Sequence, residues 1–408
     1  MPTRSRFFGI SWSRWVLIAT GFLVAVIVIN QYFFCPQYNF TEPRPFTGKH
    51  WYNPYEDIDT LRRFKCNFHA HSRAWMGLTN GNGSEQEVWD RYASLNYDVH
   101  CISNYHCISR FNDTAQNYLS AYEHGYNIKK NHYLLLNYRQ VSFRDYPLPQ
   151  TAHNKQHLIA LLQPAHDELL AINHPSLRHA FSERDLALLS GYQGMEVLRS
   201  RHTHSYREWD AALSAGKPAF LLANDDLHDV HDAGDIGLNC TFVFAPALTA
   251  SDLVQALRTG RSYGLRIGGS GQETFEDKQR KARAGLPALK SLLLRGDSLT
   301  LELSEPASEI RFIGQGGIQR ARHQGVSATY VLDTNDTYVR AHIIFPDSSV
   351  MLLNPVFRYN QEPLLRQLPS INPGKTWLMR ICGVLLLIIY LAATVMLAYR
   401  LNIRQNKI

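Results

Sequence analysis

The sequence lacks the features that stabilise small secreted domains or zinc-bound domains. Its 408 residues include only six cysteines, and no two of them form a Cys-x-x-Cys pair, which excludes a zinc ribbon and a disulfide framework. It also contains no Gly-x-Ser-x-Gly elbow, no His-Glu-x-x-His helix and no Gly-x-x-x-x-Gly-Lys loop. A serine hydrolase, a zincin protease and a P-loop nucleotidase are therefore disfavoured.

The chain also lacks a cluster of charge of one sign. Lys and Arg give it a formal net charge of +7, but they are scattered along the sequence instead of forming one stripe. This charge neither requires nor excludes a nucleic-acid partner; we expect none because two long apolar runs place the folded part of the chain outside the cytoplasm. With 45% hydrophobic and 19% charged residues, the chain is too apolar to be disordered and long enough for two folded domains.

Charged residues are absent from two long apolar runs, one near each end of the chain. Residues 15–34 and 381–399 are each about long enough for a helix that crosses a bilayer. No small-x-small cleavage site follows the first run, so a retained anchor is favoured over a signal peptide. The outer flanks carry basic residues and no acidic ones: Arg4, Arg6, Arg14, Arg400, Arg404 and Lys407.

These flanks predict a double-pass membrane protein. Both tails, 1–14 and 400–408, would lie in the cytoplasm, and the rest of the chain would lie outside it, in the periplasm if the source is bacterial. Between the two spans we expect linkers at 35–60, 266–287 and 361–380, with folded segments at 61–265 and 288–360.

Short apolar runs alternate with helix-like patterns in residues 61–265. Ser84 and Glu87 make a capping box that starts the first helix. The pattern then predicts strands at 99–103, 133–137, 169–172, 195–198 and 219–223, and helices at 114–124, 155–162, 183–189 and 206–214. Such alternation is typical of an α/β fold with parallel strands wrapped by helices. Residues 289–359 instead show short alternating strands, typical of a small all-β sandwich.

Histidine is concentrated in the α/β segment, where 15 of the 18 histidines fall. His69 and His71 form a His-x-His motif, and Asp226 and His228 form an Asp-x-His motif. Alternate residues of an extended segment point to the same side, so each pair can bind one metal ion. Because the carboxyl ends of parallel strands meet on one face, we expect both motifs to lie together with His174.

These motifs resemble those of the PHP (polymerase and histidinol phosphatase) family. The matching stretches are Asn-Phe-His-Ala-His-Ser (67–72), Tyr-Asp-Val-His-Cys-Ile-Ser-Asn-Tyr-His (97–106), Ile-Asn-His-Pro (172–175), Gly-Met-Glu-Val (194–197) and Asn-Asp-Asp-Leu-His-Asp (224–229). The resemblance implies a distorted, TIM-like (β/α)7 barrel over residues 61–265. It also implies one to three divalent ions of zinc, manganese or iron, and hydrolysis of a phosphate ester.

The resemblance further implies roles for individual residues. The expected metal ligands are His69, His71, His174, Asp226 and His228, with His106 as a further candidate. Asp226 and Glu196 are the expected catalytic residues. Arg199 and Arg261 adjoin the motifs and are candidates for substrate binding, because a guanidinium group can hold two phosphate oxygens at once.

Three positions depart from the family pattern. Tyr105 stands where the family has His, Gln140 takes the place of a carboxylate expected after the third strand, and Asn80 or Asn82 replaces an acid. An amide in place of a bridging carboxylate weakens the binding of two adjacent cations. Two hypotheses follow: a membrane-anchored, extracytoplasmic phosphoesterase acting on a small phosphorylated substrate, or a degenerate PHP-fold binding or scaffolding protein of the cell envelope.

Overall fold

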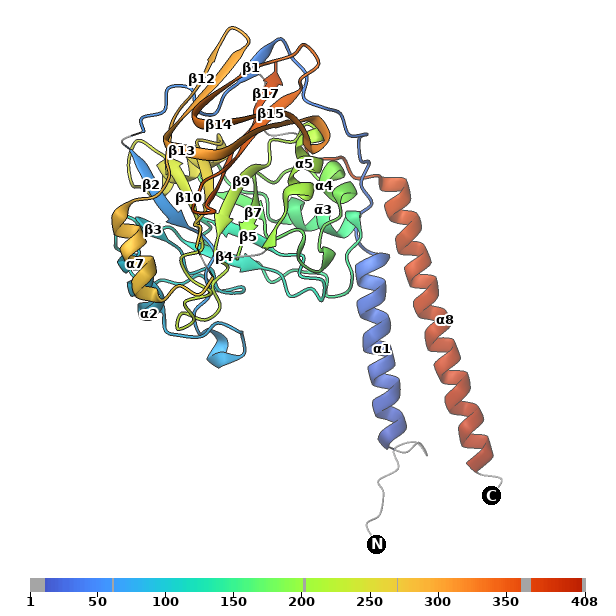
Figure 1. The fold of residues 1–408 in the computed structure, drawn as a ribbon. Coiled ribbons are helices and arrows are strands. Elements are labelled where there is room, and N and C mark those ends of the chain that lie inside the picture. The colour runs from blue at the N-terminus through green and yellow to red at the C-terminus, as the bar shows by residue number, and fades with distance from the viewer. Residues whose placement is uncertain (1–11, 61, 201–202, 270, 361–367, 406–408) are drawn as a thin grey trace.

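The computed structural model describes residues 12–60, 62–200, 203–269, 271–360 and 368–405. It shows a mixed α/β domain from which two long helices extend side by side (Figure 1). The helices are α1 (Trp12–Tyr32), α2 (Glu85–Ser94), α3 (Ala152–Leu161), α4 (Glu183–Leu188), α5 (Tyr206–Ser214), α6 (Ala250–Arg258), α7 (Phe275–Ala284) and α8 (Pro373–Gln405), with a short 3-10 turn, η1 (Trp75–Gly77).

The strands form two sheets. The first has the order β1 (His50–Tyr52), β17 (Val356–Tyr359), β15 (Tyr338–Ile344), β16 (Val350–Leu353), β11 (Ser262–Arg266), β10 (Asn239–Phe244), β2 (Arg63–Asn67) and β3 (Val99–His100), and β12 (Leu289–Arg295), β13 (Ser298–Gly314) and β14 (Ile318–Val331) join it through β15. The second has the order β4 (Ala121–His124), β5 (Tyr133–Leu136), β6 (Leu169–Ile172), β7 (Gly194–Arg199) and β8 (Thr203–His204), with β9 (Phe220–Asn224) on β7. Buried apolar side chains from both sheets and from α2 to α6 make the core.

The pairings among the described strands do not close a barrel. Parallel pairing joins β2 to β3, β6 to β7 and β7 to β9, while β4–β5, β5–β6 and the pairs made by β10 and β11 are antiparallel. Between β9 and β10 a side chain takes the place of the backbone hydrogen bonds that would pair the two strands. The Thr241 hydroxyl accepts from Ala223 N at 2.8 Å and donates to Ala223 O at 3.0 Å. The α/β class is confirmed, whereas the closed (β/α)7 barrel is not.

Most elements expected in residues 61–265 lie within a few residues of their predicted positions, and one is wrong. The capping box at α2 is present, since Ser84 N donates to the Glu87 carboxylate at 2.7 Å and Glu87 N donates to the Ser84 hydroxyl at 3.2 Å. The helix expected at 114–124 is absent, and β4 occupies its last residues. All four residues of β4 are buried, which an amphipathic surface helix would not allow.

The C-terminal strands continue the first sheet instead of standing apart from it. β16 pairs with β11, with Leu353 opposite Tyr263. The expected linker 266–287 contains α7, which begins at a capping box formed by Thr274 and Asp277. The separate β-sandwich is therefore not confirmed, and the domain limits remain predictions.

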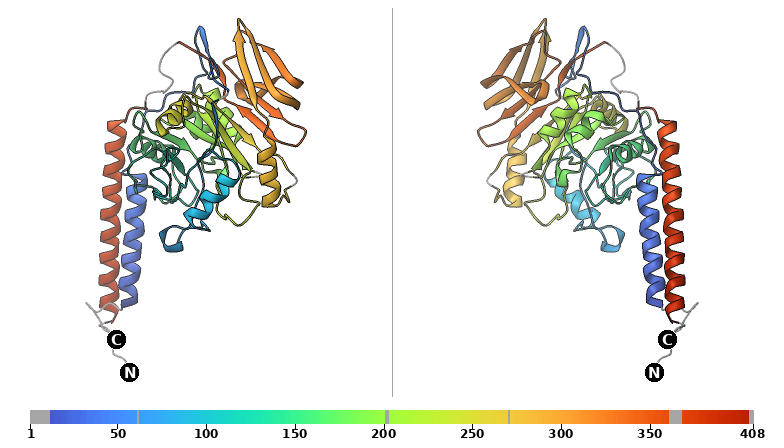
Figure 2. Two further views of the ribbon diagram at one scale, coloured as in Figure 1. Left: turned by 90° about the vertical axis from the view of Figure 1, so that its left-hand side faces the viewer. Right: turned by 90° about the vertical axis from the view of Figure 1, so that its right-hand side faces the viewer.

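The two terminal helices are long and apolar enough to span a membrane, which suggests a membrane protein. They lie side by side and extend from the same side of the domain in each view (Figures 1 and 2). A Cβ atom on Gly383 would lie 2.8 Å from the Cβ of Phe33, so glycine permits the close approach of the two chains. The orientation remains a prediction, and tail residues 1–11 and 406–408 lie outside the described residues.

Candidate metal centre

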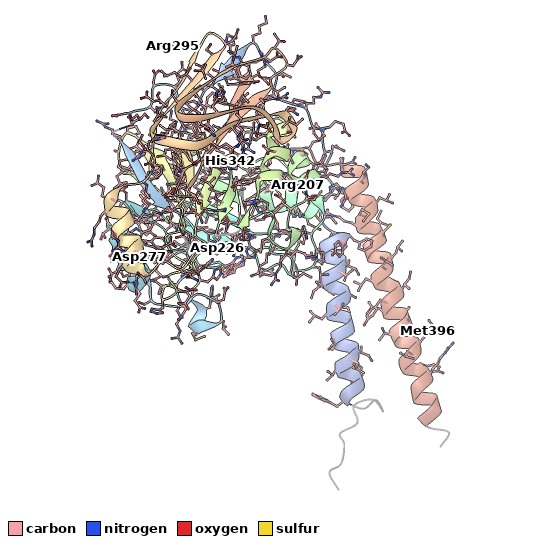
Figure 3. All side chains as sticks on the ribbon, viewed as in Figure 1. Arg207, Asp226, Asp277, Arg295, His342 and Met396 are labelled. Carbon is pink, nitrogen blue, oxygen red and sulfur yellow. The ribbon has the colours of Figure 1, made fainter. Side chains whose placement is uncertain are left out.

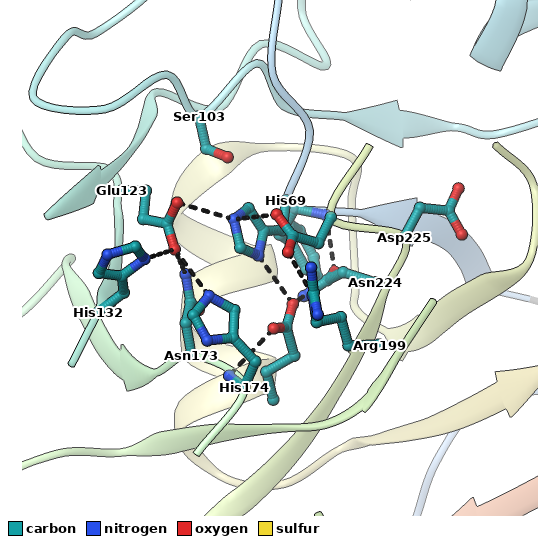
Figure 4. A network of polar contacts seen from close by, with 12 residues as sticks. His69, Ser103, Glu123, His132, Asn173, His174, Arg199, Asn224 and Asp225 are labelled. Carbon is teal, nitrogen blue, oxygen red and sulfur yellow. Dashed lines mark hydrogen bonds and ion pairs between the residues drawn. The ribbon is translucent and has the colours of Figure 1, made fainter. Parts of the chain in front are cut away.

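Four buried polar side chains converge beyond the ends of β2 and β9. His69 and His71 follow β2, Glu123 lies in β4 and Asp226 follows β9. The two predicted motifs lie against each other as extended segments, because His71 N donates to Leu227 O at 2.8 Å and Asp226 N donates to His69 O at 3.0 Å. The ligand atoms of all four side chains lie within 4.8 Å of one another, and Figure 4 shows His69 and Glu123 turned toward each other.

The spacing of the four ligand atoms matches a tetrahedral metal site. His69 Nε2 lies 3.2 Å from His71 Nε2, 3.3 Å from Glu123 Oε2 and 3.0 Å from Asp226 Oδ1. His71 Nε2 lies 3.2 Å from Glu123 Oε2 and 3.3 Å from Asp226 Oδ1. Zinc bonded to nitrogen or oxygen at roughly 2.0–2.1 Å in a tetrahedron gives about 3.3 Å between ligand atoms. The side chains are thus already placed for one ion.

The hydrogen bonding of these atoms supports the same conclusion. Glu123 Oε2 and Asp226 Oδ1 are buried, yet neither accepts a hydrogen bond from the described residues. A buried carboxylate oxygen without a donor is costly. A cation at this point would satisfy both oxygens and both Nε2 atoms at once, so the donor set fits a divalent metal.

Glu123 also belongs to a second group of candidate ligands. Its other oxygen, Oε1, lies 2.8 Å from His132 Nδ1 and 3.0 Å from His174 Nε2, and Asn173 Nδ2 donates to it at 3.0 Å. Glu123, His132 and His174 can hold a second ion. One carboxylate therefore faces both groups, as a bridging ligand does in a two-metal site.

Glu196 orients His69 from behind. Its Oε1 accepts from His69 Nδ1 at 2.9 Å and from Asn224 Nδ2 at 3.0 Å, and its Oε2 accepts from His174 N at 3.1 Å. With Nδ1 donating its hydrogen bond to Glu196, His69 would present the lone pair of Nε2 to a bound cation. Such a carboxylate–histidine pair fixes the tautomer and orientation of a metal ligand.

Glu196→Gln is expected to weaken metal binding about 10- to 100-fold. Both carboxylate oxygens accept from N–H donors, so the glutamine NH₂ group would face one of these donors. Competition with a chromophoric chelator measures the affinity. Glu302→Gln, the same change at an exposed residue of β13, is the control and should bind metal as the wild type does. Equal affinity in all three proteins would show that Glu196 does not orient His69.

The carboxylates make the centre attractive to positive charge. Burial would lower the pKa of His69, but Asp226, Glu123 and Glu196 raise it well above its ordinary value. Burial would raise the pKa of Asp226, but His69 and Arg199 hold it well below its ordinary value. For His132 burial prevails over Glu123 and lowers the pKa to about 4, so this ring is neutral at pH 7, the form that binds metal.

Two candidate ligands have a strained backbone. Asp226 has a φ of +53° and His174 a φ of +27°, in or beside the left-handed region that residues with a Cβ atom rarely adopt. Such conformations cost on the order of 1–3 kcal/mol each and concentrate at functional sites. The strain therefore supports a functional role for the centre.

Two other predicted residues lie at its edge. Arg199, the last residue of β7, donates through Nε to Asp226 Oδ2 and is partly exposed. His228 packs with its ring centroid 4.6 Å from that of His71, and its Nδ1 donates to Asp226 O at 2.7 Å. His228 is thus beside the first ligand group without being one of its four members.

Two predicted residues are not brought to the centre. His106 uses both ring nitrogens elsewhere, since Nδ1 lies 2.8 Å from Ser142 O and Nε2 accepts from Gly125 N at 2.9 Å. Arg261 precedes β11 and pairs by its backbone with Phe244, which lies opposite Arg63 at the start of β2. His69 follows the other end of that strand, so Arg261 is at the wrong end of the sheet to bind substrate there.

The departures from the family pattern have different positions. Tyr105 covers the centre, with its ring stacked on His71 at 4.5 Å. Gln140, Asn80 and Asn82 are exposed, and none of them is in either ligand group.

Two candidate ligands, Glu123 and His132, were not predicted from the sequence. Glu123 supplies the carboxylate that was expected at Gln140. The available signal was Gly125, a strand breaker directly after the run Ala121–His124.

No protein-family model matches the chain, and no curated protein matches it significantly. One similar solved structure is a two-domain protein from Bacteroides vulgatus that contains a predicted PHP-like metal-dependent phosphoesterase. It is 13% identical, with a TM-score of 0.38, and the match covers 78% of this chain and 100% of that chain. PsfC from Pseudomonas syringae is 12% identical, with a TM-score of 0.36, over 50% of this chain and 92% of its own. At these TM-scores neither likeness bears on the function of this chain.

Proposed function

We propose that this protein is a membrane-anchored, metal-dependent phosphoesterase with its catalytic domain outside the cytoplasm. The observation that carries the proposal is Glu123, whose two oxygens face two groups of imidazole nitrogens. A carboxylate placed between two such groups would help to hold two divalent cations, the number that many phosphoesterases use. Four imidazoles and two carboxylates suit zinc, manganese or iron.

When bound, a pair of divalent ions lowers the pKa of water and stabilises the charge on phosphoryl oxygens. The residues at the edge of the centre supply the rest. Arg199 presents a partly exposed guanidinium that can bind a phosphate oxygen. Burial lowers the pKa of His228 despite the nearby Asp226 carboxylate, and because Nδ1 donates to a carbonyl, the neutral ring offers its Nε2 lone pair as a proton acceptor.

The scaffolding alternative loses its main support. It rested on the replacements at Tyr105, at Gln140 and at Asn80 or Asn82, and Glu123, from β4, provides a carboxylate of the kind expected at Gln140. The extracytoplasmic location is supported by the basic flanks of the two apolar runs. A small phosphorylated substrate or an envelope component and the lipid bilayer are the partners that this function requires.

The test measures bound metal and turnover on the full chain in mild detergent. We expect two divalent ions per chain by plasma mass spectrometry and hydrolysis of p-nitrophenyl phosphate that is lost on chelation and restored by manganese or zinc. His69→Ala should lower turnover about a hundredfold or more, whereas His50→Ala, at an exposed position on β1, should not. A chain without tightly bound ions and without turnover would refute the proposal.

A further inference from the structure

The turn η1 exposes large apolar side chains. Trp75 is 46% exposed, Met76 97% and Leu78 84%. Trp75 and Met76 both have left-handed backbone, with φ of +50° and +54°, so the fold presents these side chains to the outside against local backbone preference. A contiguous exposed apolar group of this kind marks a contact surface more often than a scattered residue does.

Further exposed apolar side chains lie beside this turn. Phe143 is 59% exposed, with its ring centroid 6.3 Å from that of Trp75. The His106 ring contacts both Phe143, at 5.5 Å, and Tyr126, at 5.6 Å. Trp75, Phe143 and Tyr126, with Met76 and Leu78 of the same turn, form a surface that we call the apolar rim.

The apolar rim borders the metal centre directly. Trp75 Nε1 donates to Tyr105 O at 2.7 Å, and the Tyr105 ring stacks on the candidate ligand His71 at 4.5 Å. Asp226, labelled in Figure 3, lies on the side of the domain toward which α1 and α8 extend. Whatever covers the rim is therefore next to the reacting groups.

The same region is fastened to α1. Gln31 Nε2 donates to Leu148 O at 2.9 Å, and Tyr32 Oη donates to Pro149 O at 2.8 Å. The loop that carries Tyr126 and Ile128 is held to this segment, because Ile128 N donates to Pro147 O at 3.2 Å. The loop that carries Tyr126 is thus tied to the domain-facing end of α1.

The apolar rim lies at the level of the apolar helices. In Figures 1 and 2 the light-blue segment that carries η1 reaches past the domain-facing end of α1 and lies level with the helix itself. The apolar window of α1 extends to Tyr32, at that domain-facing end. A bilayer crossed by α1 therefore extends to the level of η1.

The charge of the surrounding segments is also suited to a bilayer surface. Residues 73–83 and 126–144 contain no Asp or Glu, but they contain Arg73, Lys129, Lys130, Arg139 and Arg144. Aromatic and aliphatic side chains beside Lys and Arg are typical of segments that lie in the interface of a membrane with anionic head groups.

From these contacts we propose that the apolar rim dips into the bilayer that α1 and α8 cross, and that the metal centre acts on the phosphate monoester of a lipid head group. This inference rests on the proposed phosphoesterase function. Water adds to phosphorus, the bond from phosphorus to the lipid oxygen breaks, and the lipid alcohol takes a proton, so that the lipid alcohol and inorganic phosphate are the products. The lipid stays in the membrane while its head group reaches the centre past Tyr105.

Depth of insertion tests the membrane contact without relying on activity. The full chain carries Met76→Cys or, as a control, Ile318→Cys, each labelled with an environment-sensitive fluorophore after Cys107 and Cys382 are changed to Ser. In phosphatidylcholine–phosphatidylglycerol vesicles the label at 76 should shift to the blue and be quenched by doxyl lipids. The label at 318, which is 58% exposed on β14, should stay in water. A label at 76 that remains in water overturns the inference.

Turnover tests the substrate class. Met76→Ser with Leu78→Ser should lower hydrolysis of dioleoyl phosphatidate in these vesicles about tenfold and leave hydrolysis of p-nitrophenyl phosphate unchanged. Ile318→Ser with Val331→Ser, at exposed residues of β14, should change neither rate. If the wild type hydrolyses p-nitrophenyl phosphate but not phosphatidate, or if the rim variant slows both equally or neither, the lipid inference is wrong. If the wild type hydrolyses neither substrate, the proposed function itself fails.

Discussion

Replacing Glu123 by Gln is expected to remove both tightly bound ions and to lower phosphoesterase turnover about a thousandfold or more. Glu123 is the one side chain shared by the two ligand groups of the described residues, with Oε2 toward His69 and His71 and Oε1 toward His132 and His174. The amide carries no charge, and its NH₂ group would point at one set of ring nitrogens. The change therefore disturbs both groups together.

The measurement combines plasma mass spectrometry with turnover across a range of added manganese. Glu302→Gln repeats the same chemical change at an exposed position and should retain the wild-type metal content and rate. If Glu123→Gln kept two ions and full turnover, the bridging role would be wrong. Asp226 would then be the one carboxylate ligand that the metal centre requires. Loss of one ion with retained turnover would assign catalysis to a single ion and likewise contradict the bridge.

Three of the four members of the first ligand group, His69, His71 and Asp226, were accessible from sequence because the spacing within each motif reports local geometry. His-x-His and Asp-x-His each place alternate side chains on one side of an extended segment. The structure brings them together through hydrogen bonds between the segments at His69 to His71 and at Asp226 to Leu227. His174 follows β6 as expected and joins the second group.

The missed ligands depend on strand direction, which the local pattern does not encode. His132 lies just before the first residue of β5. In an all-parallel fold that end of the strand would lie on the face opposite the metal centre. Because β5 runs antiparallel to both β4 and β6, its first residues lie beside the last residues of those strands. Asn173 N accordingly donates to His132 O at 3.1 Å. Glu123 escapes prediction for a related reason, since it lies in β4, where the sequence pattern predicts the end of a helix.

The long-range pairing of the C-terminal strands was also beyond the sequence. Their alternation predicted β structure, although β13 and β14 are longer than the short strands expected, and periodicity does not say which strand pairs with which. β16 adds to β11, and through β10 and β2 the same sheet reaches the residues before His69. The C-terminal segment therefore supports the strand that positions the metal centre.

The contact between α5 and β15 makes this support testable. Arg340 Nε and Nη2 donate to the two carboxylate oxygens of Asp210 at 2.8 and 2.7 Å, and Tyr338 Oη donates to Asp210 Oδ1 at 3.1 Å. The Arg340 side chain is only 2% exposed. The pair joins a helix that covers the second sheet to a strand of the first.

Arg340→Ala is expected to lower the free energy of unfolding by about 3–5 kcal/mol, because it leaves the Asp210 carboxylate with an uncompensated, largely buried charge. Urea unfolding in mild detergent, followed by tryptophan fluorescence, measures the loss. Arg311→Ala is the same change in a more exposed ion pair, with Glu309. It should lower the free energy of unfolding by about 1 kcal/mol or less. Equal losses in the two variants would mean that the buried Asp210–Arg340 pair does not hold the C-terminal strands to the α/β part.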